Sequence, residues 1–122
     1  MVGRVEMREA TYFILAALQQ EPRHGYAIMR FAQESSGGRV RLSTGTLYTA
    51  LDRLSSARLI EPDREEVVDG RARRYYRLTD AGTAALLAEA NRFAEMSRLV
   101  TGDAVAQPAA AARPRRPRVR PA

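Results

Sequence analysis

Two stretches of this sequence carry side chains whose types and spacing could do chemistry. Residues 43–54 read STGTLYTALDRL, and the first turn holds small hydroxyl residues and a glycine but no acid. At a helix start, where unpaired N–H groups and the dipole attract anions, such residues suit phosphate and base-edge contacts. The second stretch, GRARR, gathers Arg71, Arg73 and Arg74 beside a tight turn, within reach of a phosphate track or a minor groove.

Each stretch also has a plainer interpretation. The hydroxyl turn could be the N-cap of an ordinary helix whose outer face is simply solvated. The arginines could be charges on a strand edge that discourage aggregation, with Glu65 and Glu66 on the opposite strand. The order of the two stretches, with the arginine hairpin directly after the helix, favours the binding interpretation.

Catalytic and metal chemistry have little support in the sequence. There is no cysteine, and His24 is the only histidine, so a metal site would lack further ligands of these types. Nothing around His24 resembles a nucleophile turn, and no glycine-rich phosphate loop occurs. We therefore predict a protein that is not an enzyme and uses no metal or cofactor, with His24 capping or packing at a helix start.

Length and charge narrow the class further. A chain of 122 residues with 45% apolar residues can form one modest core. The longest apolar run, residues 10–18, is too short to span a bilayer, so we expect a cytoplasmic protein without a membrane segment. All 20 basic residues are arginine, and the net charge is +6. Residues 1–100 carry only +2 and residues 101–122 carry +4, so a polyanionic partner would need a local patch.

The elements that position these side chains follow from periodicity and turn signals. Apolar spacing predicts helices over residues 6–20, 24–34 and 80–100, and a third helix that Ser43 caps and that ends near Ala57. Short β-prone segments at 59–66 and 73–78 flank Asp69-Gly70, a strong hairpin-turn signal. Thr79 is expected to cap the last helix. The order predicts a mainly α fold with a two-stranded β wing, that is, a winged helix-turn-helix plus a C-terminal helix.

Three regions are expected along the chain. Residues 1–78 would form the winged helix-turn-helix, residues 79–100 a dimerisation helix, and residues 101–122 a disordered Pro/Ala/Arg tail that adds only sequence-independent affinity. Leu47, Leu51 and Leu54 should face the core, which leaves the opposite face of the third helix exposed.

The last helix is apolar on more than one face, which a monomer of this size would leave partly exposed. We expect a second copy to cover it, although burial against the first helix within one subunit would also account for the pattern. A two-fold dimer would present two such helices to a pseudo-palindromic duplex site. The expected interface residues are Leu86, Ala90, Phe93, Met96, Leu99 and Val100.

Three segments together resemble a known family. HGYAIM, LSTGTLYTALDRLSSARLI and RRYYRLTDAG are similar in order and spacing to the PadR family of bacterial transcriptional regulators, over about residues 7–100. Ala57-Arg58 departs from the pattern, since the family usually has an acidic residue and a glycine there, and this puts the turn geometry in question. The resemblance implies a winged helix-turn-helix homodimer of the smaller subfamily, most often a repressor that a small molecule releases from DNA.

The combined interpretation is a homodimeric, DNA-binding repressor, with Tyr76 and Leu78 structural. The chain has no tryptophan, so aromatic contacts to a small hydrophobic or aromatic effector would fall to Tyr12, Phe13 and Phe93. The alternative is a winged-helix interaction or scaffold module without specific DNA binding. The residues expected to contact double-stranded DNA are Ser43, Thr44, Thr46, Tyr48, Thr49, Arg53, Arg71, Arg73 and Arg74.

Overall fold

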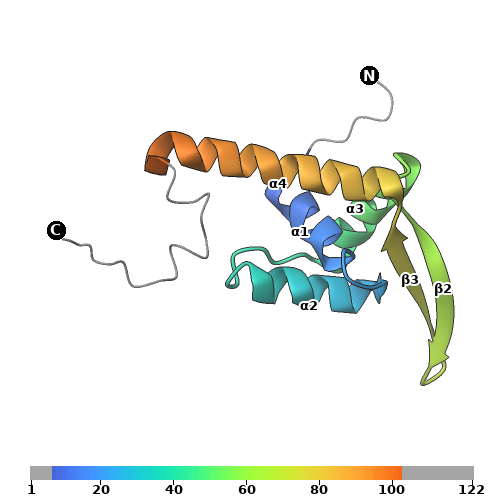
Figure 1. Ribbon diagram of the computed structural model, residues 1–122. Coiled ribbons are helices and arrows are strands. Elements are labelled where there is room, and N and C mark those ends of the chain that lie inside the picture. The colour runs from blue at the N-terminus through green and yellow to red at the C-terminus, as the bar shows by residue number, and fades with distance from the viewer. Residues whose placement is uncertain (1–6, 103–122) are drawn as a thin grey trace. The chain divides into compact units, whose positions relative to one another are not determined.

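The computed structural model describes residues 7–102, and the predicted fold class is confirmed. Within this range the chain is mainly helical with one small antiparallel sheet (Figure 1). The expected tail lies outside the described residues from position 103 onward. In chain order the elements are α1 (Glu9–Ala17), β1 (Arg23–His24), α2 (Gly25–Ser35), α3 (Thr44–Ser56), β2 (Ile60–Val68), β3 (Arg71–Leu78) and α4 (Asp80–Thr101).

Two of the predicted helix starts have the capping geometry that the sequence indicates. The Ser43 side-chain oxygen accepts a hydrogen bond from the Thr46 backbone N–H at 3.1 Å, which satisfies an otherwise unpaired donor at the start of α3. The Thr79 hydroxyl does the same for the Gly82 N–H at 2.9 Å, at the start of α4. The hydroxyl residues at both starts are therefore structural, whatever else they contact.

The first helix is shorter than predicted, because a side chain from outside it takes over its end. Arg23 donates a guanidinium hydrogen bond of 2.6 Å to the Ala17 carbonyl, which the helix leaves free at its C-terminus. α1 therefore ends at Ala17 rather than at residue 20. Its first helical residue is Glu9 rather than residue 6, and residues 7 and 8 are not helical.

The turn after α3, whose geometry Ala57-Arg58 put in question, is a regular helix end. Arg58 has a φ of 63°, in the left-handed region that glycine adopts most easily. The Leu59 N–H donates to the Leu54 carbonyl at 3.0 Å, and the Arg58 N–H donates to the Ser55 carbonyl at 3.0 Å. These bonds complete a Schellman-type helix end.

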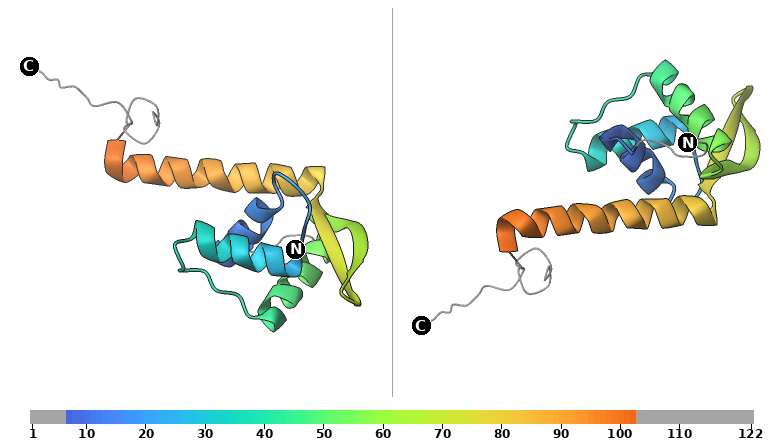
Figure 2. Two further views of the ribbon diagram at one scale, coloured as in Figure 1. Left: turned by 90° about the horizontal axis from the view of Figure 1, so that it is seen from below. Right: turned by 90° about the horizontal axis from the view of Figure 1, so that it is seen from above.

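The sheet has one strand more than the predicted hairpin, in the order β1-β3-β2. β1 is only two residues long, and Arg23 and His24 pair with Tyr76 and Tyr75 of β3. Its shortness hides it from periodicity, because it exists only through this pairing. β2 and β3 form the predicted antiparallel hairpin, which extends away from α1, α2 and α3 (Figures 1 and 2).

The hairpin turn and its one irregularity follow from particular residues. Asp69 and Gly70 have φ values of 53° and 77°, as a tight two-residue turn requires, so the predicted turn is confirmed. In β2, Pro62 pairs with Tyr76 and Arg64 with Tyr75, which leaves Asp63 as an extra residue in a bulge.

The chain contacts divide the molecule into two compact units, which meet within α4. The first unit ends at Leu87 and the second begins at Ala88. Within the first unit, α1, α2, α3, the sheet and the start of α4 supply one apolar core. No helix in the described range is both long and apolar enough to cross a membrane. The buried core residues are Ile14, Leu15, Ala17, Leu18, Ile28, Leu47, Ala50, Leu51, Leu54, Ile60, Tyr76 and Leu86.

Candidate nucleic-acid interface

The outer face of α3 is a continuous exposed surface. Leu47, Leu51 and Leu54 are fully buried, as the leucine spacing predicts, and Ala50 is buried beside them, so the opposite side of the helix points outward. No acidic residue lies in the first turn of the helix. The exposed side chains are mostly small and polar, which permits close approach to a groove. The residues of this surface, which we call the α3 face, are Ser43, Thr44, Gly45, Thr46, Tyr48, Thr49, Asp52 and Arg53.

Tyr48 is fixed by a contact that the sequence did not reveal. Its side chain reaches the first residue of α2, where a Cβ built on Gly25 would lie only 2.7 Å from the Tyr48 hydroxyl oxygen. A glycine at this position therefore leaves room for the phenol. The tyrosine remains 46% exposed, so it is held in place and still offers a polar edge. Gly25 of the HGY segment and Tyr48 of the GTLY segment thus pack against each other.

The three wing arginines that the sequence singles out differ in their surroundings. Arg74 faces Glu65, with a guanidinium nitrogen 3.5 Å from its carboxylate. Arg71 pairs in register with Val68, and Arg73 with Glu66. Within the described residues neither Arg71 nor Arg73 is within ion-pair distance of a carboxylate. All three are exposed, and Arg71 and Arg73 differ from Arg74 in making no close ion pair, although Glu66 still attracts Arg73 electrostatically.

Glu66 lies opposite Arg73 but makes no close ion pair with it, because other partners hold its carboxylate. The Tyr75 hydroxyl donates to Glu66 at 3.0 Å, and Arg64 donates to it at 3.2 Å while its guanidinium also lies 3.9 Å from the centre of the Tyr75 ring. These hydrogen bonds, from Tyr75 first and then Arg64, lower the pKa of Glu66 below its ordinary value. The Glu66 carboxylate is thus held within the hairpin.

At its base the hairpin is neutralised by a small ion-pair network. Arg77 donates to Glu61 and to Asp63, both at 2.9 Å, and Arg64 lies 3.1 Å from Asp63. The hydrogen bond from Arg77 is the main reason that the pKa of Asp63 is lowered. The bulge supplies Asp63 to this network. Positive charge without a partner therefore lies toward the tip of the wing, at Arg71 and Arg73.

His24 packs against the sheet. It occupies the N-cap position of α2 without a side-chain capping bond, and its ring meets the Tyr75 ring edge-on at 5.2 Å between centres. Burial, and then the nearby charge of Arg73, lower the pKa of His24 below its ordinary value of 6.5. Among residues 7–102 no group of three or more metal-ligating side chains is close enough to hold an ion.

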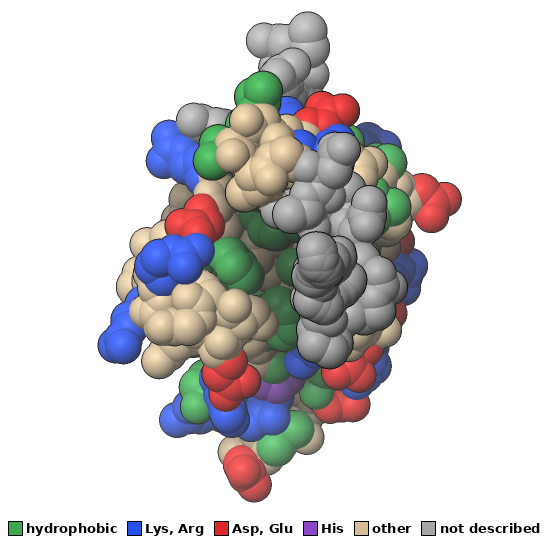
Figure 3. All heavy atoms as spheres, turned by 60° about the vertical axis from the view of Figure 1, so that its left-hand side comes forward, with side chains coloured by type: hydrophobic (Ala, Val, Ile, Leu, Met, Phe, Trp, Pro, Cys, Tyr) green, Lys and Arg blue, Asp and Glu red, His purple; other side chains and the backbone are tan. Residues whose placement is uncertain are grey.

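Basic and acidic side chains are interspersed on the face drawn in Figure 3, in keeping with the small net charge of residues 1–100. Further pairs, such as Arg30 with Glu34 at 2.9 Å and Arg39 with Glu9, offset more of the arginines. Arg53 on the α3 face has no such pair within the described part of the chain. The unbalanced cations thus include Arg53 on α3 and two arginines of the wing.

The expected dimer residues on α4 fall into two groups. Leu86 is buried in the core of the first unit, so it has little surface to offer a second copy. Its place in the core follows from the packing of the first turns of α4. Of the other expected residues, Phe93, Met96, Leu99 and Val100 are exposed and Ala90 is half-buried, and Leu87, which was not expected, is exposed as well.

The aromatic residues expected around an effector are only partly brought together. The Tyr12 and Phe13 rings on α1 lie edge to face, 6.0 Å between centres, and both are half-buried. Phe93 belongs to the second unit.

Comparison with known proteins decides the family. Residues 14–88 match the sequence model of the transcriptional regulator PadR-like family. The chain belongs to this family. The PadR-like family is one of transcriptional regulators and not of enzymes.

Individual relatives of this PadR-like chain agree with that assignment. The transcriptional regulator Rv3488 of Mycobacterium tuberculosis is 47% identical over 70 residues, which are 57% of this chain and 64% of that protein. The chain thus covers a little less than two thirds of Rv3488.

Solved structures of PadR proteins share the fold. A PadR family transcription regulator from Clostridium difficile superposes with a TM-score of 0.65 at 25% identity, over 77% of this chain and 96% of that one. Bacillus subtilis PadR, crystallised in complex with operator DNA, has a TM-score of 0.59 at 26% identity. That match covers 67% of this chain and 46% of the Bacillus chain.

Proposed function

We propose that this protein is a DNA-binding transcriptional repressor that acts as a homodimer. The observation that carries the proposal is the combination of an exposed, mostly polar α3 face with unbalanced arginines on the adjoining wing. A helix of this kind fits the major groove, and a cationic hairpin beside it can hold the sugar-phosphate backbone. The structure of the similar Bacillus subtilis PadR in complex with operator DNA supports the same function.

The two elements would contribute differently. Thr49 and Arg53 lie on the α3 face opposite the buried leucines, where side chains can meet base edges. Ser43, Thr44, Thr46 and Tyr48 would flank them and contact the backbone. Arg71 and Arg73 would neutralise phosphates, which carry no sequence information. Arg74 would contribute less than its neighbours, because it already faces Glu65.

Dimerisation is proposed from the apolar residues of α4. Leu99 and Val100 are 87% and 86% exposed, and Phe93 and Met96 are also exposed. Large apolar side chains at this density on one helix favour a partner, and a second copy provides a matching surface. Leu86 is left out of the proposed interface because it is buried. A two-fold dimer would bind a pseudo-palindromic operator.

Release by a small molecule is the remaining part of the proposal. The family resemblance implies release by a small molecule, and in the first unit Tyr12 and Phe13 would supply aromatic contacts to a hydrophobic or aromatic effector. Replacing Tyr12 with Ala should weaken such a ligand more than it weakens operator binding in its absence.

The experiment that tests the function begins with selection of an operator from genomic fragments. Binding of that operator and of a random duplex is then measured over a salt series. Arg71→Ala or Arg73→Ala should weaken both duplexes by similar factors and flatten the salt slope by about one unit. Thr49→Ala or Arg53→Ala should cost about 1–3 kcal/mol on the operator and far less on random DNA.

Arg30→Ala is the matched control, since it removes one positive charge that already faces Glu34. It should leave the salt slope nearly unchanged. Uniform losses at Thr49 and Arg53, with selective losses in the wing, would reverse the roles of the two elements. A protein that binds no duplex at either low or high salt would instead be a protein-interaction module. The small net charge of residues 1–100 is the observation that favours this alternative.

A further inference from the structure

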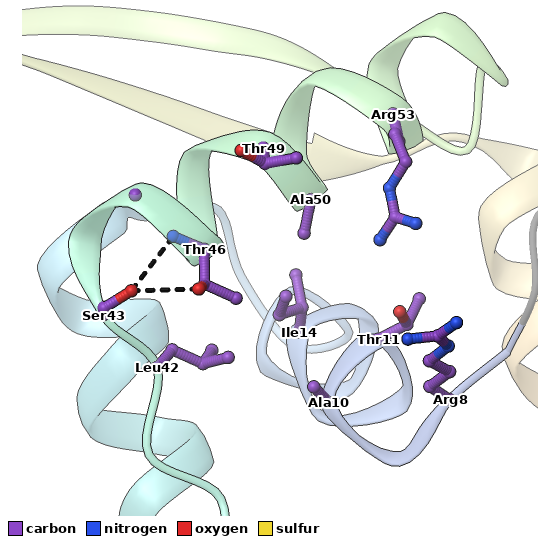
Figure 4. A pocket seen from close by; sticks show the side chains of 11 residues that line it. Arg8, Ala10, Thr11, Ile14, Leu42, Ser43, Thr46, Thr49, Ala50 and Arg53 are labelled. Carbon is purple, nitrogen blue, oxygen red and sulfur yellow. Dashed lines mark hydrogen bonds between the residues drawn. The ribbon is translucent and has the colours of Figure 1, made fainter.

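A hollow of about 660 Å³ opens between the start of α1 and the α3 face (Figure 4). Both helices belong to the first unit. The volume falls in the range of small-molecule pockets, about 300–1,000 Å³. None of the described residues that line it is acidic or aromatic. The lining residues are Arg8, Ala10, Thr11, Ile14, Leu42, Ser43, Gly45, Thr46, Thr49, Ala50 and Arg53.

The walls of the hollow offer hydrogen-bond donors from two helices. Arg8 at the start of α1 and Arg53 on α3 both direct their guanidinium groups toward the space between the helices (Figure 4). Two guanidinium groups that converge in this way suit a planar anion, because each can donate two parallel hydrogen bonds to a carboxylate.

Thr11 gives independent evidence of a missing partner. The residue is only 2% exposed, and its hydroxyl makes no hydrogen bond to any residue in the described part of the chain. A buried hydroxyl without a partner is unfavourable by about 1–3 kcal/mol and is rare in native proteins. Because Thr11 lines the hollow beside Arg8, a bound acceptor could satisfy it.

The floor of the hollow indicates the chemistry of the part of the ligand beyond its anionic group. Ile14, Leu42 and Ala50 form an aliphatic surface to one side of the two arginines, and Ala10 also lines the hollow (Figure 4). A phosphate group alone would leave this surface uncovered, whereas an alkyl chain would bury it.

We propose that the hollow binds an aliphatic carboxylate of medium chain length, with the carboxylate between Arg8 and Arg53 and the chain over Ile14 and Leu42. Ser43, Thr46, Thr49 and Arg53 are shared with the proposed DNA-contacting surface. If the proposed function holds, ligand and operator compete directly for the α3 face, without a conformational change. This site is separate from the aromatic contacts expected at Tyr12, Phe13 and Phe93.

The binding test uses the full chain without DNA. Hexanoate, octanoate and decanoate are titrated while the backbone amides of Thr11, Thr46 and Ala50 are followed by NMR. Saturable shifts are expected for at least one acid, with much weaker effects from 1-octanol and from inorganic phosphate. Arg8→Gln and Arg53→Gln should each weaken binding of that acid by about tenfold. Ala10→Leu, which fills the hollow without removing a charge, should abolish it and leave DNA affinity unchanged.

The outcomes separate the site from the function. Phosphate binding as tightly as octanoate would overturn the proposal in favour of a plain phosphate contact. Equal binding of 1-octanol, no saturable shift with any of the three acids, or an unaffected Ala10→Leu variant would also overturn it. Octanoate that binds without raising the apparent Kd for operator would refute the competition. If octanoate binds but no operator can be selected for the protein, the ligand site is supported and the proposed function is refuted.

Discussion

Gly82, in the first turn of α4, is seated directly on the backbone that follows α3. A Cβ built on this glycine would lie 2.0 Å from the Leu59 carbonyl oxygen and 2.9 Å from its carbonyl carbon. The same carbonyl accepts a hydrogen bond of 3.1 Å from the Thr79 N–H. Replacing Gly82 with Ala therefore requires backbone, and not only a flexible side chain, to move by more than an ångström.

The magnitude follows from two opposing effects. Alanine in a helix is more favourable than glycine by up to about 1 kcal/mol. Overpacking of this kind costs about 1–3 kcal/mol or more, and the loss of the Thr79 bond to Leu59 adds about 1 kcal/mol. The steric effect wins, so after the helix gain is subtracted we expect Gly82→Ala to lower the free energy of unfolding by about 1–3 kcal/mol. For a domain of this size that corresponds to a Tm lower by roughly 5–25 °C.

The assay is urea denaturation followed by far-UV circular dichroism, with Gly45→Ala as the matched control. Gly45 also lies in the first turn of a helix, but a Cβ there would meet nothing within 4 Å. Its replacement should leave stability unchanged or raise it by up to about 1 kcal/mol. If Gly82→Ala is as stable as the parent protein, α4 is not seated on the Leu59 carbonyl and the packing argument is refuted.

Three further predictions concern turns and the interface. Arg58→Gly should raise the free energy of unfolding by about 0.5–1 kcal/mol. The left-handed conformation costs an arginine about 1–2 kcal/mol, and part of the gain from removing that cost is offset by the larger backbone entropy of glycine in the unfolded chain. A lower urea midpoint would contradict this prediction. Gly25→Ala should displace the Tyr48 phenol and weaken operator binding. The loss should be smaller in a Tyr48→Phe background, because the hydroxyl oxygen nearest the new Cβ is then absent. Equal losses in both backgrounds would mean that the contact between Gly25 and Tyr48 is not the cause. The single histidine allows a clean NMR titration, in which the pKa of His24 should lie below 6.5 and should rise in Arg73→Ala, since that charge helps to lower it. Because folding favours the neutral ring, its contribution to stability is complete above about pH 6.5 and is lost as the pH falls below that value, and an unshifted pKa would contradict the packing of His24.

The features that could be predicted from the sequence are those whose cause is local. Ser43 and Thr79 are hydroxyl residues directly before periodic apolar segments, and both cap the helices that follow. The spacing of Leu47 and its neighbours places one face of α3 in the core. Asp69-Gly70 specifies the hairpin turn through its positive φ angles. Each of these signals lies within a few residues of the structure that it specifies.

The missed features depend on residues that are distant in sequence. β1 exists only because Arg23 and His24 pair with Tyr76 and Tyr75, and the spacing of two residues has no period to detect. The end of α1 depends on the Arg23 side chain. The contact of Tyr48 with Gly25 requires the packing of α2 against α3.

The distinction among the wing arginines is also non-local. Arg74 and Arg73 are adjacent in sequence and look equivalent there. Each lies opposite a glutamate in the hairpin register, but the bonds that hold Glu66 leave only Arg74 with a close ion pair. Counting the wing arginines from the sequence therefore overstates the positive charge that is available to a DNA backbone.

The internal pairing of arginines has a consequence for the search that a regulator makes through a genome. Affinity for random DNA grows with every cation that releases a counterion, and a bacterial chromosome offers millions of random sites. In this protein Arg64, Arg74 and Arg77 are already matched by carboxylates of the same hairpin. Within residues 7–102 few charges then remain to hold a DNA-binding protein at random sequences. Under the proposed function, the specificity of this part of the chain would therefore depend mainly on the base contacts of α3, and sequence-independent affinity would come mainly from the arginines beyond residue 102.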